Sequence, residues 1–209
     1  MTPIIGVDFD NTIALYTELA HTIALEMHLI PPEGITGGKD TVRDYIRSSP
    51  AGDEGWQQVQ AEMYGPRMGE ALLAPGFPEF VKEARDFGYR LVIVSHKTQF
   101  SNLGRSTTDL RESALSWMMA HGFFSHTGLA FEKGDVSFAS TRLEKILRIR
   151  ELGCSWFIDD LPEVFAEPAF PPTTKKILFG SDGDGTYATG ESWHEIPNLI
   201  FPHSPPHIS

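Results

Sequence analysis

The chain has 209 residues and a formal net charge of −11, a size that fits one medium domain or a core domain with a smaller insert. The negative charge disfavours a nucleic-acid polymer as a partner, because the long-range field of the protein would repel the phosphate backbone. Cys154 is the single cysteine, so an internal disulfide is excluded and a reducing compartment is expected. Apolar runs of membrane-spanning length and signal-peptide regions are both missing from the sequence, so we expect a cytoplasmic location and no membrane partner. The sequence does not indicate an oligomeric state.

The first element is a short apolar run, residues 4–7, that ends in two acids spaced by one residue, Asp8 and Asp10. A short buried run followed at once by an Asn-Thr pair predicts a central strand of a parallel sheet. Side chains alternate along a strand, so Asp8 and Asp10 are expected on the same face. Ligands of open α/β sheets bind beyond the carboxyl ends of the strands. Two carboxylates held close together there indicate a cation, proton transfer, or both.

The next sixty residues show helical patterns and no strand pattern. Apolar residues recur at roughly helical spacing over residues 13–29, and two further helical stretches are predicted at residues 41–46 and 56–64, separated by Pro and Gly. We therefore predict a small helical cap insert at residues 15–72, placed after the first strand where it can act as a lid. An ordinary connection with surface helices is the alternative. The core domain would comprise residues 1–14 and 73–209.

From residue 73 onward, helices and strands alternate. The predicted elements are, in order, a helix at 79–87, a strand at 90–95, a helix beginning after Asp109, a strand at 127–131, a helix beginning after Thr141, and strands at 155–158 and 176–179. The helix after Thr141 is expected to bury Leu143 and Leu147, and the Gly- and Pro-rich remainder is predicted to be extended coil. This alternation is typical of right-handed βαβ units and predicts an α/β fold with a doubly wound parallel sheet.

Polar side chains stand at the ends of three predicted strands. Asp8 and Asp10 end the first, Ser95 ends the second, and Asp159 and Asp160 end the fourth. Because the carboxyl ends of parallel strands meet at one edge of the sheet, we expect these side chains to converge. Four carboxylates in one crevice need a compensating cation, and Mg²⁺, which prefers oxygen ligands, is the natural choice. The absence of a histidine cluster near these positions argues against zinc.

These residue types fit phosphoryl transfer. Beside a cation, the Asp8 carboxylate can attack phosphorus and form an aspartyl phosphate that water then hydrolyses. Asp10 is placed to protonate the leaving oxygen and later to take a proton from the water. Ser95 is expected to donate a hydrogen bond to a phosphoryl oxygen, and a lysine to neutralise the phosphoryl charge. Lys145 is the first candidate for that lysine, and Lys133 is its competitor.

Three further residues are candidate substrate-binding residues. Asn11 follows the acid pair, and His96 and Lys97 follow Ser95 directly, so the chain itself keeps them near the expected phosphoryl site. The substrate would be a small phosphorylated metabolite, and both nucleotide monophosphates and sugar phosphates remain open.

The order and type of these motifs resemble the haloacid dehalogenase (HAD) superfamily over residues 3–14 and 74–180. The residues that carry the resemblance are Asp8-Phe9-Asp10-Asn11-Thr12, Ser95 after Leu91-Val92-Ile93-Val94, Lys145, and Ile158-Asp159-Asp160. The resemblance implies a Rossmannoid core with a cap, Mg²⁺ dependence and an aspartyl-phosphate intermediate. It also implies that the backbone carbonyl of Asp10 joins Asp8, Asp159 and Asp160 as a metal ligand. Dehalogenases of the superfamily lack the second aspartate, so Asp10 favours a phosphatase or a phosphomutase.

The leading hypothesis is therefore a Mg²⁺-dependent phosphomonoester hydrolase. A phosphomutase begins with the same phosphoryl transfer and is the nearest alternative. A catalytically silent binding member of the same fold is a further alternative, because a fold alone does not establish activity. A phosphorylated receiver-type signalling domain is disfavoured, because there the acid pair and the phosphoacceptor occur in the reverse order and the chain is shorter.

Overall fold

The computed structural model describes residues 2–101, 107–180 and 185–201. The chain divides into two compact units. The first comprises residues 1–13, 73–96 and 122–209, and the second comprises residues 14–72 and 97–121. Among the described residues, none of the helices is both long enough and apolar enough to span a bilayer.

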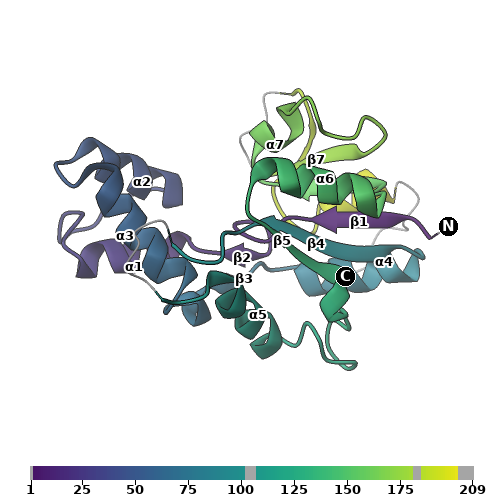
Figure 1. The fold of residues 1–209 in the computed structure, drawn as a ribbon, viewed down its shortest axis with the longest axis horizontal. Coiled ribbons are helices and arrows are strands. Elements are labelled where there is room, and N and C mark those ends of the chain that lie inside the picture. Colours follow the sequence, from purple (N-terminus) through teal and green to yellow (C-terminus); the bar gives the residue numbers. More distant parts are fainter. Residues whose placement is uncertain (1, 102–106, 181–184, 202–209) are drawn as a thin grey trace. The chain divides into compact units, whose positions relative to one another are not determined.

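The first unit is built on a parallel sheet. Its six described strands lie in the order β5-β4-β1-β6-β7-β8, and each neighbouring pair is parallel. The strands are β1 (Ile4–Val7), β4 (Arg90–His96), β5 (Val136–Ala139), β6 (Trp156–Asp159), β7 (Lys175–Phe179) and β8 (Ala188–Gly190). The accompanying helices are α4 (Phe77–Asp86), α6 (Arg142–Leu152), α7 (Pro162–Ala166) and α8 (Ile196–Ile200), with a 3₁₀ turn η2 (Lys133–Asp135). In Figure 1, α6 and α7 lie on one side of these strands and α4 on the other. The predicted α/β class and parallel sheet are confirmed.

The second unit is helical. Its helices are α1 (Thr17–Glu26), α2 (Lys39–Ser48), α3 (Gly52–Tyr64) and α5 (Leu110–Ala120), with a 3₁₀ turn η1 (Met68–Glu70). Two short strands, β2 (Ala14–Leu15) and β3 (Leu72–Leu73), pair with each other where the chain passes between the units. The three helices predicted before residue 72 are present.

One difference from the predicted domain organisation lies in α5, which the sequence analysis placed in the core. In the structure α5 belongs to the second unit, where the Trp117 indole N–H donates to the Ala71 carbonyl over 2.9 Å. The boundaries of a cap at residues 15–72 stay a prediction.

The third strand was placed wrongly. Residues 127–129 form a turn and residues 130–131 have no regular structure, with Ala130 at a positive φ of 47°. The strand that pairs with β4 is β5. Leu129 and Phe131 are nevertheless buried. The apolar pattern that suggested a strand therefore reflects the burial of these side chains and not a strand. As a consequence, Lys133 comes just before β5, whereas the prediction placed it after a strand at residues 127–131.

The C-terminal region was also predicted incorrectly as coil. The structure contains β8 and α8 there, although residues 181–184 and 202–209 of that region lie outside the described residues. Both elements are short, and their Gly and Pro content hides the periodicity that would indicate them.

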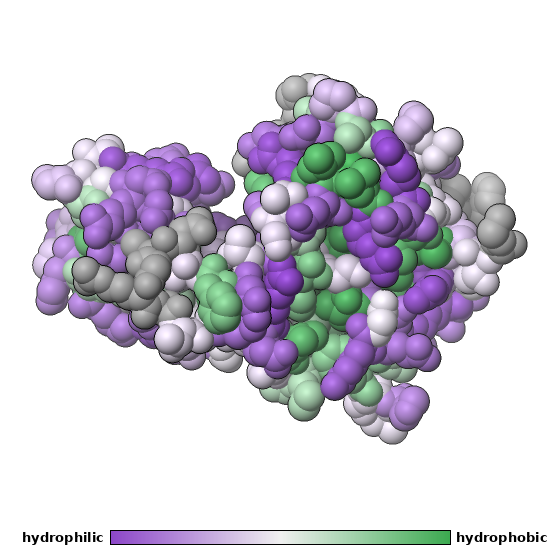
Figure 2. Space-filling model, in the orientation of Figure 1, coloured by the Kyte–Doolittle hydropathy of each residue, from purple (hydrophilic) through white to green (hydrophobic). Residues whose placement is uncertain are grey.

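The outer face of α6 carries apolar side chains that are exposed to solvent. Leu143 and Leu147, which were expected to be buried, are 55% and 40% exposed. Figure 2 shows hydrophobic surface gathered over α6 and β5 on the visible face of this unit. A cavity of about 430 Å³ there is lined by residues that include Phe138, Leu147 and Arg148.

Close packing of β1 against β6 requires a glycine at position 6. A Cβ atom at Gly6 would lie 2.5 Å from Cδ2 of Phe157 and 3.0 Å from Sγ of Cys154, and both neighbours are buried. Burial also raises the pKa of the Cys154 thiol to about 11, as fits a core residue.

We expect Gly6→Ala to lower the free energy of unfolding by about 1–3 kcal/mol, because the added methyl group overpacks this contact. Urea unfolding followed by circular dichroism measures the change. Gly134→Ala is the control, because a Cβ at Gly134 has no neighbour within 4 Å. Equal losses in the two variants would contradict this account.

Candidate active site

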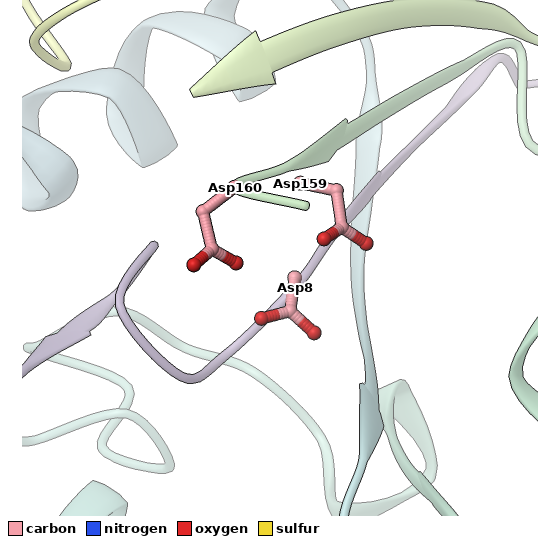
Figure 3. Close-up of side chains that lie close together, drawn as sticks. All are labelled: Asp8, Asp159 and Asp160. Atoms are coloured by element: carbon pink, nitrogen blue, oxygen red, sulfur yellow. The ribbon is translucent and has the colours of Figure 1, made fainter. Parts of the chain in front are cut away.

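The sheet brings three of the four predicted acids together. β1 lies between β4 and β6, and the backbone N–H of Asp8, the residue after β1, donates to the Ile158 carbonyl over 2.9 Å. Asp159 is the last residue of β6 and Asp160 follows it. Each of the three acids offers a carboxylate oxygen, and these oxygens all lie within 4.8 Å of one another. Figure 3 shows the three side chains facing a common space.

This group fits a divalent cation. Asp8 and Asp159 are buried and Asp160 is half-buried, and one Asp159 oxygen accepts the Leu161 backbone N–H over 3.1 Å. Three convergent carboxylates supply the hard oxygen ligands that Mg²⁺ prefers. The Asp10 side chain is not a member of this group, so its expected contribution to a cation is confined to its backbone carbonyl.

Lys145 contacts two of the three acids. Its Nζ donates to Oδ1 of Asp8 and to Oδ2 of Asp159, each over 2.6 Å, and the side chain is 2% exposed. α6 supplies this lysine, and the Thr141 hydroxyl caps α6 by accepting the Glu144 N–H. The structure therefore brings Lys145 to Asp8, whereas Lys133 lies on η2, before β5.

The charges shift one another's proton affinity. Burial raises the pKa of Asp8 well above its ordinary value. Lys145 opposes that shift, while Asp159 and Asp160 add to it. Burial alone would lower the pKa of Lys145, but Asp159 and Asp8 outweigh burial and raise it above its ordinary value. Lys145 is therefore a fixed positive charge, and because burial makes the carboxylate form of Asp8 costly, both this ammonium and a bound cation would favour that form.

A stabilising effect of Mg²⁺ should consequently grow with pH. The folded state binds the Asp8 proton more tightly than the unfolded state does, because the pKa of Asp8 is raised on folding. The resulting stabilisation is fully present below the pKa that Asp8 has in the unfolded state, and it is lost as pH rises through the pKa that Asp8 has in the folded state. A cation competes for the same carboxylate, so the rise in Tm caused by MgCl₂ should be larger at about pH 8 than at about pH 5. Thermal unfolding with and without the metal tests this, and a pH-independent rise would contradict it.

Two buried hydroxyls lie beside the strand ends. Among the residues that the structure describes, Oγ of Ser95 and Oγ1 of Thr12 are buried and have no hydrogen-bond partner, and both residues are almost fully buried. Buried polar atoms in native proteins are normally paired, so the Ser95 hydroxyl fits its predicted role of donor to a phosphoryl oxygen. Thr12 was not among the predicted site residues, although a threonine so close to an acid pair is a signal that could have been used.

Asn11 occupies a strained turn after the acid pair. Its φ is +62°, a left-handed conformation that is uncommon for a residue other than glycine. The Phe9 carbonyl accepts the Ile13 N–H over 2.9 Å and closes the turn. The Asn11 amide donates to Oδ2 of Asp160 over 3.2 Å, so this side chain orients one of the three acids. Its predicted contact with substrate stays a prediction.

His96 and Lys97 have different surroundings. His96 ends β4, is exposed, and its Nε2 lies 3.1 Å from the Ser140 carbonyl oxygen. Lys97 belongs to the second unit and is buried there, with its Nζ 4.5 Å from the centre of the Tyr64 ring. The substrate-binding roles predicted for both residues stay predictions.

Comparison with known proteins identifies the fold. Protein-family models give no match, and no curated protein matches significantly. Among solved structures, a HAD-superfamily hydrolase from Ehrlichia chaffeensis has a TM-score of 0.54 at 18% identity, over 95% of each chain. A HAD family hydrolase from Deinococcus radiodurans R1, solved with bound phosphate and sodium, has a TM-score of 0.59 at 13% identity, over 96% of each chain. An L-2-haloacid dehalogenase has a TM-score of 0.54 at 12% identity, over 95% of this chain and 98% of the other. The chain therefore has the fold of the HAD-superfamily hydrolases.

Proposed function

We propose that the protein is a Mg²⁺-dependent phosphomonoester hydrolase that acts on a small phosphorylated metabolite through an aspartyl phosphate on Asp8. The observation that carries the proposal is the pair of 2.6 Å contacts from Lys145 to Asp8 and Asp159, with Asp160 beside them, at the carboxyl ends of adjacent strands. The phosphate and sodium bound to the Deinococcus radiodurans hydrolase of this fold agree with it.

The residues suit the first half of the reaction. Asp8, Asp159, Asp160 and the Asp10 carbonyl would hold the cation, which would neutralise the acids and polarise the phosphoryl group. An Asp8 carboxylate oxygen bonds to phosphorus while the bond from phosphorus to the leaving oxygen breaks. Asp10 donates its proton to that oxygen, so the product leaves as a neutral alcohol.

The second half returns Asp8 to its starting state. Water attacks the phosphorus of the aspartyl phosphate, and Asp10, now ionised, takes the water proton. The bond between phosphorus and the Asp8 oxygen breaks, and inorganic phosphate leaves. Throughout both steps, the Lys145 ammonium and the Ser95 hydroxyl offset the charge on the phosphoryl oxygens. Asn11, His96 and Lys97 are proposed to contact the remainder of the substrate.

Asp10 is the residue that separates this proposal from dehalogenation. A halide leaves without a proton, so a dehalogenase has no use for a general acid at this position, whereas an alkoxide leaving group needs one. A phosphomutase uses the same first step and differs in passing the phosphoryl group to a second hydroxyl.

Phosphate release from para-nitrophenyl phosphate and from a panel of nucleotide monophosphates and sugar phosphates tests the proposal. We expect Mg²⁺-dependent turnover that chelation abolishes, and no halide release from 2-haloacids. Phosphorus NMR of the products separates hydrolysis from phosphoryl relocation on the same sugar. If no compound in the presence of Mg²⁺ yields phosphate, halide or a relocated phosphoryl group, the protein is a catalytically silent member of the fold.

A further inference from the structure

A tryptophan far along the chain contacts the turn that follows Asp8. Trp193 is 1% exposed, and its Nε1 donates to the backbone carbonyl of Thr12 over 2.9 Å in a fully buried hydrogen bond. Trp193 lies outside the motifs that predicted the site, in the region that the sequence analysis assigned to coil.

The position of Trp193 is fixed from several sides. β8 leads into it by pairing with β7, with Phe179 opposite Gly190. The Glu195 carboxylate then accepts hydrogen bonds from the Glu191 N–H and the Ser192 hydroxyl, each over 3.1 Å. The indole ring contacts three aromatic rings, and its centroid distances to Phe77, Phe80 and Phe179 are 4.9, 4.8 and 5.0 Å. The N–H is therefore held where it meets Thr12.

The turn at the other end of this bond needs support. Thr12 is fully buried and follows Asn11, whose left-handed backbone is costly for a side chain of its kind. Such conformations are kept where several contacts with neighbouring residues stabilise them. A buried carbonyl without a partner would favour rearrangement of the turn. The same turn carries Asp8 and Asp10 and, through the Asn11 amide, orients Asp160.

We propose that Trp193 is a positioning residue of the candidate active site, which holds the Asp8–Thr12 turn in the geometry that binds the cation and presents Asp8 to phosphorus. Trp193 touches neither substrate nor cation and acts through the Thr12 carbonyl. The catalytic part of this inference rests on the proposed function, whereas the metal-binding part does not.

A matched pair of variants separates positioning from simple core packing. Trp193→Phe keeps an apolar ring and removes the donor. Trp117→Phe removes an equivalent bond, because the buried Trp117 indole donates to the Ala71 carbonyl over the same 2.9 Å in the second unit. Both variants should have lower Tm values than the wild type.

We expect only Trp193→Phe to weaken Mg²⁺ binding, measured by calorimetry below the Tm of both variants, by about tenfold or more, as is typical when a residue that orients metal ligands is lost. Its kcat for para-nitrophenyl phosphate should fall by a similar factor with little change in KM, because the reacting groups and not the substrate contacts are displaced. Trp117→Phe should bind Mg²⁺ and turn over as the wild type does.

Wild-type Mg²⁺ affinity and wild-type kcat in Trp193→Phe would overturn the inference and leave the proposed function intact. If the wild-type protein releases no phosphate, the proposed function fails, and the Mg²⁺ affinities of the two variants still decide the positioning role. If Trp193→Phe does not fold, Glu195→Ala replaces it, because Glu195 is exposed and shapes the turn that carries Trp193. A smaller loss of Mg²⁺ affinity in Glu195→Ala supports the inference, and an unchanged affinity overturns it.

Discussion

Replacing Asp8 with asparagine is expected to abolish phosphate release, with kcat falling by about three orders of magnitude or more. An amide of the same size fills the same space but cannot form an acyl phosphate. The variant should nevertheless fold, because burial raises the pKa of Asp8 and so disfavours its carboxylate form, and a neutral amide avoids that cost. Single-turnover and steady-state assays on one phosphomonoester measure the loss.

Asp86→Asn is the control for that experiment, because Asp86 is an exposed acid at the end of α4. It should keep wild-type activity. A transient covalent phosphoenzyme, trapped by acid quenching in the wild type and missing from Asp8→Asn, would identify the nucleophile directly. Substantial turnover by Asp8→Asn would instead show that another group attacks phosphorus and would remove Asp8 from that role.

Replacing Lys145 with methionine is expected to cause the largest loss of stability in the metal-free protein. Asp8 and Asp159 are buried on either side of the ammonium, and removing one partner of a buried charge cluster leaves the others uncompensated. Such changes typically cost about 3–5 kcal/mol of unfolding free energy. Urea unfolding in the presence of a chelator measures the difference, and added Mg²⁺ should recover part of it by supplying positive charge to the same acids.

Lys133→Met is the matched control, because Lys133 is an exposed lysine on η2, and its effect should stay within about 0.5 kcal/mol. The double variant Lys145→Met/Asp8→Asn provides a second check. Removing a negative charge along with the positive one should restore part of the stability, so the two changes should not be additive. Equal losses in Lys145→Met and Lys133→Met would show that the ammonium is not the compensating charge.

The parts of the fold that could be predicted are those governed by local pattern. β1, β4 and β6 are short apolar runs that end in polar residues, and parallel pairing then requires those ends to meet, so Asp8, Ser95 and Asp159 followed from sequence. β5 could not be recognised, because its residues are mostly half-buried and Ser137 interrupts its short apolar run. The turn at residues 127–131 gave a stronger apolar signal without being a strand.

The parts of the site that could not be predicted depend on contacts between distant segments. Sequence spacing left Lys145 and Lys133 as competitors, and the placement of η2 before β5 and of α6 after it separates them. The bond from Asn11 to Asp160 depends on where two loops meet in space. Trp193 and Thr12 are 181 residues apart in the sequence, and a local sequence pattern cannot predict a hydrogen bond between residues so widely separated.

The central place of β1 bears on how the protein is made. On a ribosome β1 emerges before both of its neighbours in the sheet, β4 and β6, and the second of these ends only at Asp159. Until β6 has been synthesised, one edge of the apolar strand β1 is unpaired in the nascent chain. An exposed, unpaired strand edge favours chaperone binding and off-pathway association. Pairings between such distant stretches also slow refolding. Recovery after dilution from denaturant should therefore be slow and should improve when chains are kept dilute.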